Sequence, residues 1–571
     1  MSARTEVLVV GAGPVGLTLA LDLGRRGVRT MLIERNVTAS ALPKMERCNG
    51  RTMEIYRRLG VADAIRAAGY PDDGPMDVYL TRSLAEPPLV HLPYPSVRAA
   101  KADIAAHNDG RPLEPYQLIS QYTIEPLLRR FVEELPTVDV RFGCELIDFA
   151  QDDDGVTARV AGASGEESSV RADYIVGCDG GASTVRKALG IALEGDGNIR
   201  RLRQALFHAP ELYDRVPTGR GRHYHVVQPL FPFLIVQDST KHWTLHCQAE
   251  SDAEMLPIFE RAVGFDTPIR LLSVNPWTQH LLCAQRYREG RAFIAGDAAH
   301  LVIPTGGLGM NTGVGDAIDL AWKLAATVRS WGGPQLLASY ETERRQIGLR
   351  NVAASRAAMQ GRFEGWRVAP DLEEMARRFD REQRKVTEIL GIEAGYRYVD
   401  SPLVAHEPGD GPDPNSVHYV PTAHAGARLP HVWLHRERAD RGGGDGGSDR
   451  DAVAVQDLIG DGYTLLRLGE APANADALVA AMRATGAPFD VLDVPDRVAR
   501  ELYERDLVLV RPDLHVVWRG NDIPDDPRAL AALATGHAVP VTMSLSKGES
   551  ASSPVTLSPS KGESASRPFA S

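Results

Sequence analysis

The chain has 571 residues, more than one hydrophobic core usually supports, so we expect at least two domains. Its composition is ordinary for a globular protein, and the formal net charge of -11 argues against nucleic-acid binding, because phosphates repel an acidic surface. No apolar stretch reaches the roughly 18–20 residues of a membrane span, and the first residues lead into a folded element rather than a signal peptide. We therefore expect a cytoplasmic protein that binds neither nucleic acid nor membrane.

Five cysteines are scattered along the chain, at Cys48, Cys144, Cys178, Cys247 and Cys283. Their number is odd, and no pair has the spacing of a CxxC motif or of metal ligands. We therefore expect buried apolar thiols, no metal site and a reducing compartment.

The first forty residues predict a strand, a tight glycine turn, a helix and a second strand, namely EVLVV, GAGPVG, LTLALDLGRRG and RTMLIER. Such a βαβ unit requires a parallel sheet with a right-handed crossover. Backbone N–H groups at the start of the helix can bind a pyrophosphate, and glycines allow its close approach. We predict dinucleotide contacts at Gly11, Gly13, Pro14 and Gly16.

A carboxylate closes the second strand of this unit. Glu34 follows the glycine turn at the distance where an acidic side chain can accept hydrogen bonds from an adenosine ribose, and we place Arg35 in the same site. The motif alone does not distinguish FAD from NAD.

The pattern changes several times further along the chain. From about Met76 to Asp109 it loosens and predicts an excursion over the substrate side, whereas Thr123 to Glu134 predicts a helix. An acidic turn near Gly155 indicates a hairpin, and alternating segments between Ile191 and Cys283 predict antiparallel strands of a second sheet. Helical periodicity dominates from Asp316 to Leu390.

The C-terminal part alternates strands and helices again, which predicts a separate small α/β domain. The run GGGDGGSD at 442–449 is expected to be a flexible surface loop, and the repeat PVTMSLSKGESASS, PVTLSPSKGESASR cannot bury a core and is expected to be disordered. The predicted boundaries are 1–190 and 285–390 for the two parts of the dinucleotide-binding domain, 191–284 for an inserted sheet domain, 400–539 for the C-terminal domain and 540–571 for the tail.

Two further segments narrow the choice of dinucleotide. In CDGGASTVR a strand ends in the pair Asp179-Gly180, followed by Ser and Arg at helical spacing. In RAFIAGDAAHLVIPTGGLGMN a strand end carries Asp297, and a loop rich in Pro and Gly then leads into a helix.

With these three motifs in this order, the chain resembles the class A flavoprotein aromatic hydroxylases, the family of para-hydroxybenzoate hydroxylase and phenol hydroxylase. The resemblance extends from about Thr5 to Arg350. It implies an α/β fold in which a Rossmann-like FAD-binding domain carries an inserted antiparallel-sheet substrate domain. The C-terminal part resembles the thioredoxin-like domain that is appended to phenol hydroxylase and related enzymes.

The resemblance also implies roles for individual residues. Asp179 belongs to a DG motif linked to FAD and nicotinamide binding, Asp297 to a GD motif that binds the ribityl hydroxyls, and Gln121 to a flavin contact. Arg47 corresponds to a flavin-contacting arginine, although Lys44 could occupy that place instead. The backbone of the loop and helix start is expected to stabilise negative charge on the reduced flavin, with contacts at Pro304, Gly307, Gly309, Met310 and Asn311.

Bound FAD would supply the chemistry in such an enzyme. Hydride from NADH or NADPH reduces FAD, O2 adds at C4a, and the distal oxygen of the resulting C4a-hydroperoxyflavin passes to an electron-rich ring. The sequence has no second glycine-rich fingerprint for the nicotinamide, so we expect it to be a diffusible co-substrate. The expected partners are therefore a small phenol-like aromatic substrate and O2.

Substrate contacts are expected from the second sheet. On one strand His223 and His225 point to the same face, and Tyr224 points to the other. Any one histidine is more often a core or surface residue than a catalytic one. We place His225 first and His246 second as the base or substrate anchor, because a phenolate attacks more readily than a phenol. The backbone of Pro304 is expected near the flavin ring by resemblance.

Other functions remain open from the sequence. The same flavin apparatus serves enzymes that epoxidise or hydroxylate a polyketide or isoprenoid ring, and a flavin-binding protein without turnover would also keep the glycine turn. A halogenase is disfavoured because the WxWxIP signature is absent. No cysteine follows Cys283, so the thioredoxin-like domain cannot perform thiol chemistry, and we expect it to form a homodimer contact or to pack over the flavin domain.

Overall fold

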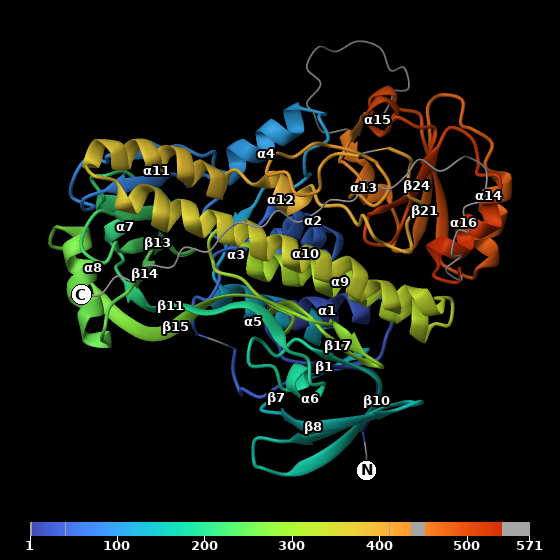
Figure 1. The fold of residues 1–571 in the computed structure, drawn as a ribbon, viewed down its shortest axis with the longest axis horizontal. Coiled ribbons are helices and arrows are strands. Elements are labelled where there is room, and N and C mark those ends of the chain that lie inside the picture. The colour runs from blue at the N-terminus through green and yellow to red at the C-terminus, as the bar shows by residue number, and fades with distance from the viewer. Residues whose placement is uncertain (1–2, 40, 410, 436–451, 539–571) are drawn as a thin grey trace, which may run out of the picture. The chain divides into compact units, whose positions relative to one another are not determined.

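The computed structural model describes residues 3–39, 41–409, 411–435 and 452–538. The glycine-rich run at 442–449 and the C-terminal repeat, for which a flexible loop and a disordered tail were predicted, lie outside the described residues. In the described part, strands form two large sheets, a smaller C-terminal sheet and two short strand pairs (Figure 1).

The first sheet is built on five parallel strands in the order β17, β10, β1, β2, β7. Its strands are β1 (Ala3–Val10), β2 (Thr30–Glu34), β7 (Val138–Phe142), β10 (Glu167–Gly177) and β17 (Ala292–Ile294), with β8 (Glu145–Asp152), β9 (Gly155–Ala161) and β16 (Arg288–Glu289) added in antiparallel pairs. The run from Val7 to Val10 is buried because both faces of a parallel sheet are covered. The predicted βαβ unit and the hairpin at Gly155 are confirmed.

Helix α1 (Pro14–Arg25) begins directly after the glycine turn, with Pro14 at its first position, where a missing N–H costs nothing. It packs between helices α5 (Gln121–Glu133) and α9 (Leu308–Val328). Two helix starts that carry predicted flavin contacts, α5 and α9, therefore lie beside the dinucleotide turn.

The second sheet has eight strands in the order β18, β15, β11, β14, β13, β12, β4, β5. They are β4 (Val78–Thr81), β5 (Val90–Leu92), β11 (Leu193–His208), β12 (His223–Val226), β13 (Phe233–Val236), β14 (His242–Cys247), β15 (Arg270–Ala284) and β18 (His300–Leu301). Most pairs are antiparallel, but β4 runs parallel to β12. The segment predicted as an excursion thus adds two strands, β4 and β5, to this sheet. The sequence did not reveal β4 because its four consecutive residues are all buried and show no alternation of apolar and polar side chains.

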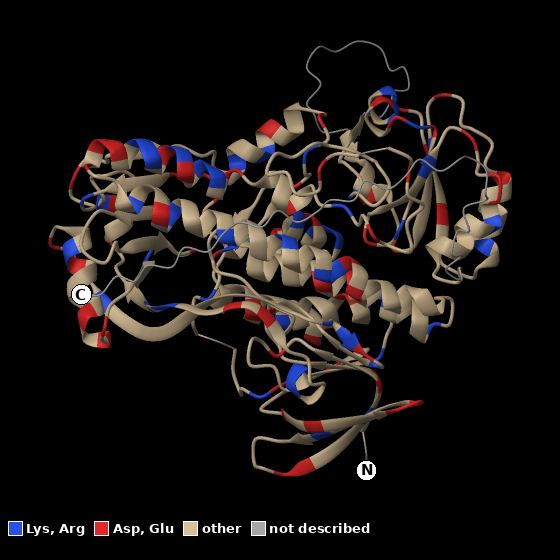
Figure 2. Cartoon of the chain, in the orientation of Figure 1, with Lys and Arg blue, Asp and Glu red and all other residues tan. Residues whose placement is uncertain are grey.

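Two long helices follow the second sheet, α9 and α10 (Pro334–Gln360), and lie against each other (Figure 1). After two short turns, η3 (Gly361–Gly365) and η4 (Trp366–Val368), helix α11 (Leu372–Thr387) carries interspersed acidic and basic side chains on its outer face (Figure 2). Its inner residue Phe379 packs with Trp366 beside β4 and β5.

The C-terminal part is a four-stranded sheet in the order β22, β21, β23, β24 with helices on both faces. Its elements are β21 (Tyr463–Leu468), β22 (Phe489–Val494), β23 (Leu507–Val510), β24 (Val516–Gly520), α13 (Val455–Leu458), α14 (Asp476–Ala484), α15 (Arg497–Tyr503) and α16 (Pro527–Ala534). Trp322 and Leu336 of the α9–α10 region pack into one of its cores. Arg511 reaches across to Glu343 and Asp319, and all three side chains are buried. This part therefore packs against helices α9 and α10.

The remaining elements are short. They are α2 (Gly50–Arg58), α3 (Ala62–Ala68), α4 (Val97–Ala106), α6 (Thr184–Ala188), α7 (Leu212–Arg215), α8 (Met255–Val263), α12 (Leu390–Ala394), η1 (Asp252–Glu254), η2 (Gly296–Ala298) and the strand pairs β3 (Arg47–Cys48) with β6 (Gln117–Leu118) and β19 (Trp433–His435) with β20 (Ala452–Ala454). None of the helices in the described ranges has the length and apolar character needed to cross a bilayer. All five cysteines are free thiols, four of them buried and Cys178 half-buried.

Candidate functional site

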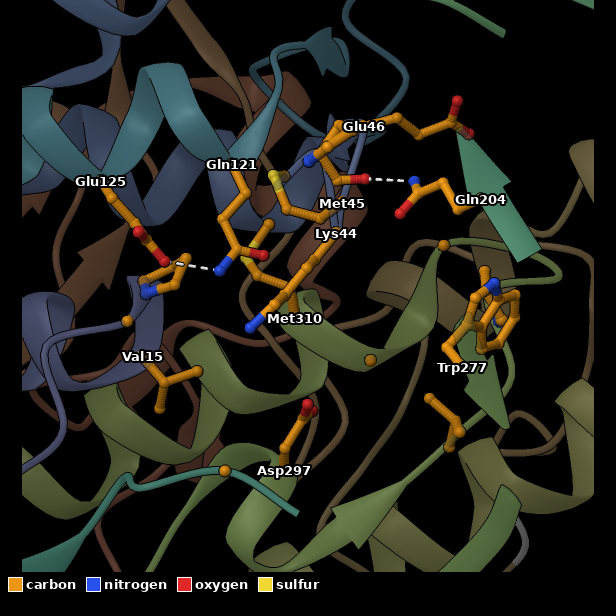
Figure 3. A pocket seen from close by; sticks show the side chains of 18 of the residues that line it. Val15, Lys44, Met45, Glu46, Gln121, Glu125, Gln204, Trp277, Asp297 and Met310 are labelled. Atoms are coloured by element: carbon orange, nitrogen blue, oxygen red, sulfur yellow. Dashed lines mark hydrogen bonds between the residues drawn. The ribbon is translucent and has the colours of Figure 1, made fainter. Parts of the chain in front are cut away.

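A cavity of about 460 Å3 extends from the glycine turn after β1 to the face of the second sheet. This volume lies within the usual range of small-molecule sites. Figure 3 shows Lys44, Gln121 and Asp297 around this space, with Trp277 on the side of the second sheet. We call the part lined by the glycine turn, Glu34 and Asp297 the cofactor end, and the part lined by the second sheet the substrate end.

The glycines of the turn serve two different purposes. Gly11 has a φ of +101°, and a Cβ there would lie 2.5 Å from the carbonyl oxygen of Cys178; a Cβ on Gly16 would lie 2.0 Å from the carbonyl oxygen of Gly11. These two positions require glycine for the fold itself. At Gly13, by contrast, the nearest heavy atom would be 3.9 Å from an added Cβ, and the residue lines the cavity. Only a ligand at the helix start would demand glycine there.

Glu34 holds the turn in place from the end of β2. Its Oε2 accepts a hydrogen bond of 2.9 Å from the backbone N–H of Ala12, and its Oε1 accepts one from the side chain of Asn36. Both Glu34 and Arg35 line the cavity next to the first turn of α1, as the sequence predicted for an adenosine contact. The donors of that first turn have no partner within the helix and can face a pyrophosphate.

The carboxylate of Asp297 is exposed to the cavity and has no hydrogen bond to any residue that the structure describes. Desolvation by the surrounding protein raises its pKa, and its neighbours His300 and Lys44 oppose that shift. A carboxylate that is exposed to a cavity can accept hydrogen bonds from the hydroxyl donors of a ligand. The ribityl chain of FAD would supply them, so this residue fits the assigned cofactor.

A buried ion network, which the sequence analysis did not identify, positions the GD motif. The carboxylate of Asp316 on α9 accepts hydrogen bonds from the backbone N–H of Gly296 at 3.0 Å and from Nε of Arg344 at 2.8 Å, and it contacts Nε2 of His300 at 2.8 Å. Its charge partners hold the pKa of Asp316 below the usual value in spite of burial. The signal in the sequence was the presence of charged residues, Asp316, Asp319 and Lys323, within a mostly apolar helix.

Asp179 of the DG motif lines the same cavity. Its Oδ2 accepts hydrogen bonds from the backbone N–H groups of Thr184 at 2.6 Å and Val185 at 3.2 Å, so it caps helix α6. Its Oδ1 is buried and has no hydrogen-bond partner in the described residues. Capping alone therefore does not satisfy this carboxylate.

Arg47 and Lys44 both line the cavity but differ in their partners. The Arg47 guanidinium donates to the carbonyl oxygen of Gly306 at 2.7 Å and to Glu393 at 2.5 Å, whereas no hydrogen bond of the Lys44 ammonium to a described residue is found. Arg47 thus fixes the loop before α9, while Lys44 remains available beside Asp297. Of the two alternatives that the sequence left open, Lys44 is the one whose charged group has no described hydrogen-bond partner.

The other predicted cofactor residues divide into two groups. Gln121 lies at the start of α5 and donates to Glu125 at 2.5 Å (Figure 3). The predicted cofactor residues that line the cavity are Gly11, Gly13, Pro14, Glu34, Arg35, Arg47, Gln121, Asp179, Asp297, Pro304, Gly307, Gly309 and Met310. Gly16 and Asn311 do not line it: the side chain of Asn311 donates to the carbonyl oxygen of Gly307 and accepts from the backbone N–H of Asn49.

At the substrate end, His223 of β12 pairs with Glu46. Its Nε2 lies 2.7 and 3.0 Å from the two carboxylate oxygens. Burial would raise the pKa of Glu46, but His223, Arg222 and Arg47 together lower it to about 2, so the group is ionised. Burial lowers the pKa of His223 in spite of Glu46, so its imidazole is neutral at neutral pH. An ionised Glu46 accepts the hydrogen of Nε2, which leaves Nδ1 of His223 as an acceptor.

His246 of β14 lines the same end and contacts Gln204 of β11 at 3.3 Å through Nε2. Gln204 also donates from its amide nitrogen to the carbonyl oxygen of Pro43 at 2.6 Å, which fixes the orientation of the amide. Nε2 of His246 is therefore an acceptor, and Nδ1 carries the hydrogen. Burial lowers the pKa of His246 to about 4, so it is a neutral donor at its free nitrogen and a weak base.

His225 is not among the residues that line the cavity. Its ring stacks on Phe233 at 4.4 Å and packs edge-on against Trp366 and Phe379, and neither ring nitrogen has a hydrogen-bond partner in the described residues. Burial holds its pKa well below the usual value. The strand does place His223 and His225 on one face, as predicted, but only His223 reaches the cavity.

Comparisons with known proteins identify the families and structures that this chain is similar to. Residues 4–355 match the family described as FAD binding domain, and residues 422–538 match the aromatic-ring hydroxylase C-terminal family. Aklavinone 12-hydroxylase RdmE of Streptomyces purpurascens is 33% identical over 551 residues, which cover 92% of this chain and 96% of that protein. The 4-methyl-5-nitrocatechol 5-monooxygenase of Burkholderia sp is 31% identical over 563 residues, which cover 92% of this chain and 96% of that protein. The solved structure of the rebeccamycin biosynthetic enzyme RebC with reduced flavin has a TM-score of 0.84 and 32% identity, covering 94% of this chain and 100% of that one.

Proposed function

Because the chain belongs to the family of FAD-dependent aromatic-ring hydroxylases, we propose that it hydroxylates a phenolic ring with O2 and NADH or NADPH as co-substrates. The observation that carries this proposal is the continuity of the cavity. It connects the carboxylate of Asp297, which has no hydrogen bond to a described residue, with the paired His223 and Glu46 at the other end. A bound cofactor and a bound ring would therefore meet inside the protein.

Bound FAD would accept electrons from the nicotinamide and activate O2. The role of the protein is to bind and orient the cofactor and the substrate and to exclude water from the site. Asp297 would accept hydrogen bonds from the ribityl hydroxyls, and Lys44 and the first turn of α9 would place positive charge beside the reduced ring. Phe231, Phe233 and Trp277 line the substrate end and support exclusion of water, which protects a reactive oxygen adduct.

We assign the proton-accepting role to His223 rather than to His225. Nδ1 of His223 is an acceptor because Glu46 fixes the opposite tautomer, and a substrate hydroxyl that donates to it becomes a better nucleophile. Glu46 acts through His223 and is a positioning residue. His246, whose pKa is near 4, is better suited to donate from Nδ1 to a substrate oxygen than to remove a proton.

Two classes of substrate, which differ in size, are candidates. A single-ring phenol follows from the resemblance, and the Burkholderia relative is named for such a compound. A polyketide ring is the second candidate, because a Streptomyces halstedii relative, 32% identical over 544 residues, is named a putative polyketide hydroxylase. The three aromatic walls of the substrate end favour a larger, polycyclic ring system. We propose the polycyclic class as the first to be tested.

The proposal is tested on purified protein. It should be yellow, release FAD on denaturation, and oxidise NADH or NADPH faster when a phenolic compound is added. Single-ring phenols and polycyclic phenols should be compared under heavy-isotope O2, and the product should gain one labelled oxygen atom. A colourless protein would overturn the assignment, and a yellow protein that never labels any phenol would identify a flavin-binding protein without turnover.

A further inference from the structure

The helix that carries Gln121 begins at a contact with the second sheet. Ser120 has the extended backbone of a helix cap, with φ of -77° and ψ of 154°, but within the described residues its side chain accepts no hydrogen bond from the backbone of the first turn of α5. Its hydroxyl instead donates to Oδ2 of Asp238 at 2.6 Å, and its backbone N–H donates to the same oxygen at 3.1 Å. Asp238 therefore holds the start of α5 from outside the helix.

Burial and charge make this contact a strong one. Asp238 is 7% exposed and Ser120 is 1% exposed, so little water reaches the hydrogen bonds between them. A carboxylate acceptor makes a stronger hydrogen bond than a neutral one, and negative charge is favourable near a helix N-terminus. Oδ1 of Asp238 accepts from the backbone N–H of Ser239 at 2.9 Å and from the hydroxyl of Tyr122 at 3.4 Å. Both carboxylate oxygens are thus fixed.

Asp238 directly follows a wall of the substrate end. Phe233 and Ile235 of β13 and the following Gln237 alternate towards the cavity, as side chains on one face of a strand do. The side-chain amide of Gln237 donates to the hydroxyl of Thr244 on β14 at 3.2 Å, which keeps it in line with the sheet. A ligand that packs against this wall therefore contacts the segment that leads into Asp238.

On the other side of the contact lies the cofactor end. Gln121 follows Ser120 in the chain, and Figure 3 shows its side chain pointing from α5 into the cavity. Its amide donates to Glu125 at 2.5 Å, and an added Cβ on Gly13 of the glycine turn would lie 3.9 Å from Oε1 of Glu125. The pair formed by Asp238 and Ser120 therefore connects a wall of the substrate end with the residue predicted to contact the flavin.

We propose that Asp238 is a positioning residue that transmits the binding of a substrate on β13 to Gln121 beside the flavin. This inference rests on the proposed function and adds to it a residue that acts through Ser120. Packed elements shift as units rather than deforming continuously, so a ligand that displaces β13 would carry the start of α5 with it. Two side chains that act as one unit should also give non-additive effects when both are removed.

The test adds 2-naphthol, a two-ring phenol, to saturation and follows the visible absorbance of the flavin in the FAD-loaded enzyme. The wild-type spectrum should shift, and the shift should be at least about twofold smaller in Asp238→Ala and in Ser120→Ala. Adding Ser120→Ala to Asp238→Ala should change nothing further, because the hydroxyl has already lost its acceptor.

The matched control is Asp496→Ala. Asp496 also accepts from a backbone N–H at a helix start, that of Ala499 on α15 at 2.8 Å, and it belongs to the C-terminal part. This variant loses a comparable contact and should keep the wild-type shift.

A shift of wild-type size in Ser120→Ala or in Asp238→Ala, even with lowered stability, would show that the contact is only structural and would overturn the inference. A further loss in the double variant, or a wild-type spectrum that 2-naphthol does not move, would also overturn it. Ser120→Ala removes a single hydroxyl, so it keeps the test decisive if Asp238→Ala does not fold. Failure of the proposed function looks different, since it appears as absent FAD or as absent labelling of any phenol, whereas the spectral shift requires no turnover.

Discussion

At the cofactor end the backbone shapes the cavity, through glycines, helix starts and two carboxylates, whereas at the substrate end side chains from several strands and a turn between helices meet. The first arrangement is built from several short motifs, such as the turn at Gly11 with Glu34, which the parallel sheet brings together. The second depends on His223 and Glu46, which are 177 positions apart. The difference indicates that recognisable short motifs define the cofactor end, whereas the register of the second sheet defines the substrate end.

The largest effect on the cofactor end is expected from a substitution of Gly13. An added Cβ there meets no protein atom closer than 3.9 Å, so Gly13→Ala should fold normally but lose FAD retention by at least about tenfold, because the methyl group would occupy the phosphate position. Flavin content per protein is the measurement. Gly197→Ala, with the same open space for a Cβ but far from the turn, is the control. Full flavin occupancy in the Gly13 variant would remove the pyrophosphate from this helix start.

Glu46→Gln should impair the substrate end and leave the cofactor end intact. FAD should be retained, but His223 loses the carboxylate that fixes its tautomer, so product formation should fall by about ten- to a hundredfold. Oxidation of the nicotinamide should continue and release H2O2, and the ratio of product to nicotinamide consumed is measured. A variant that remains fully coupled would show that the pair is structural only.

A pH effect on stability should distinguish His246 from a solvent-exposed histidine. Burial lowers its pKa from 6.5 to about 4, so the unfolded chain binds a proton in a range where the folded protein does not. Wild-type stability relative to His246→Gln should be constant above about pH 6.5 and fall as the pH drops towards 4, by about 2 kcal/mol between pH 7 and pH 5. Urea unfolding of both proteins at these two pH values measures it. A gap that does not change with pH would contradict the burial of a neutral imidazole.

The smallest effect is expected at His225. Its ring lies among Phe233, Trp366 and Phe379 and has no polar partner in the described residues, so His225→Phe should preserve packing and leave coupling unchanged. The ratio of product to nicotinamide consumed is again the readout. Strong uncoupling in this variant would restore the sequence-based preference for His225 over His223.

The contrast between the two ends also explains what could be predicted from the sequence. The glycine turn, Glu34 and Asp297 follow from spacing along short segments, and all of them except Gly16 of the turn line the cavity. The pairing of His223 with Glu46 could not be predicted, because it depends on how β12 packs against a loop far away in sequence. The strands β4 and β5 were missed for the same reason, since only the completed sheet shows where a short apolar run belongs.

The most direct test of the account is a structure of the purified protein with its FAD bound. We predict the adenosine beside Glu34, the ribityl chain at Asp297, and the ring next to Lys44 with one face open towards His223 and His246. A flavin bound elsewhere, or one whose ring cannot reach the substrate end of the cavity, would contradict it.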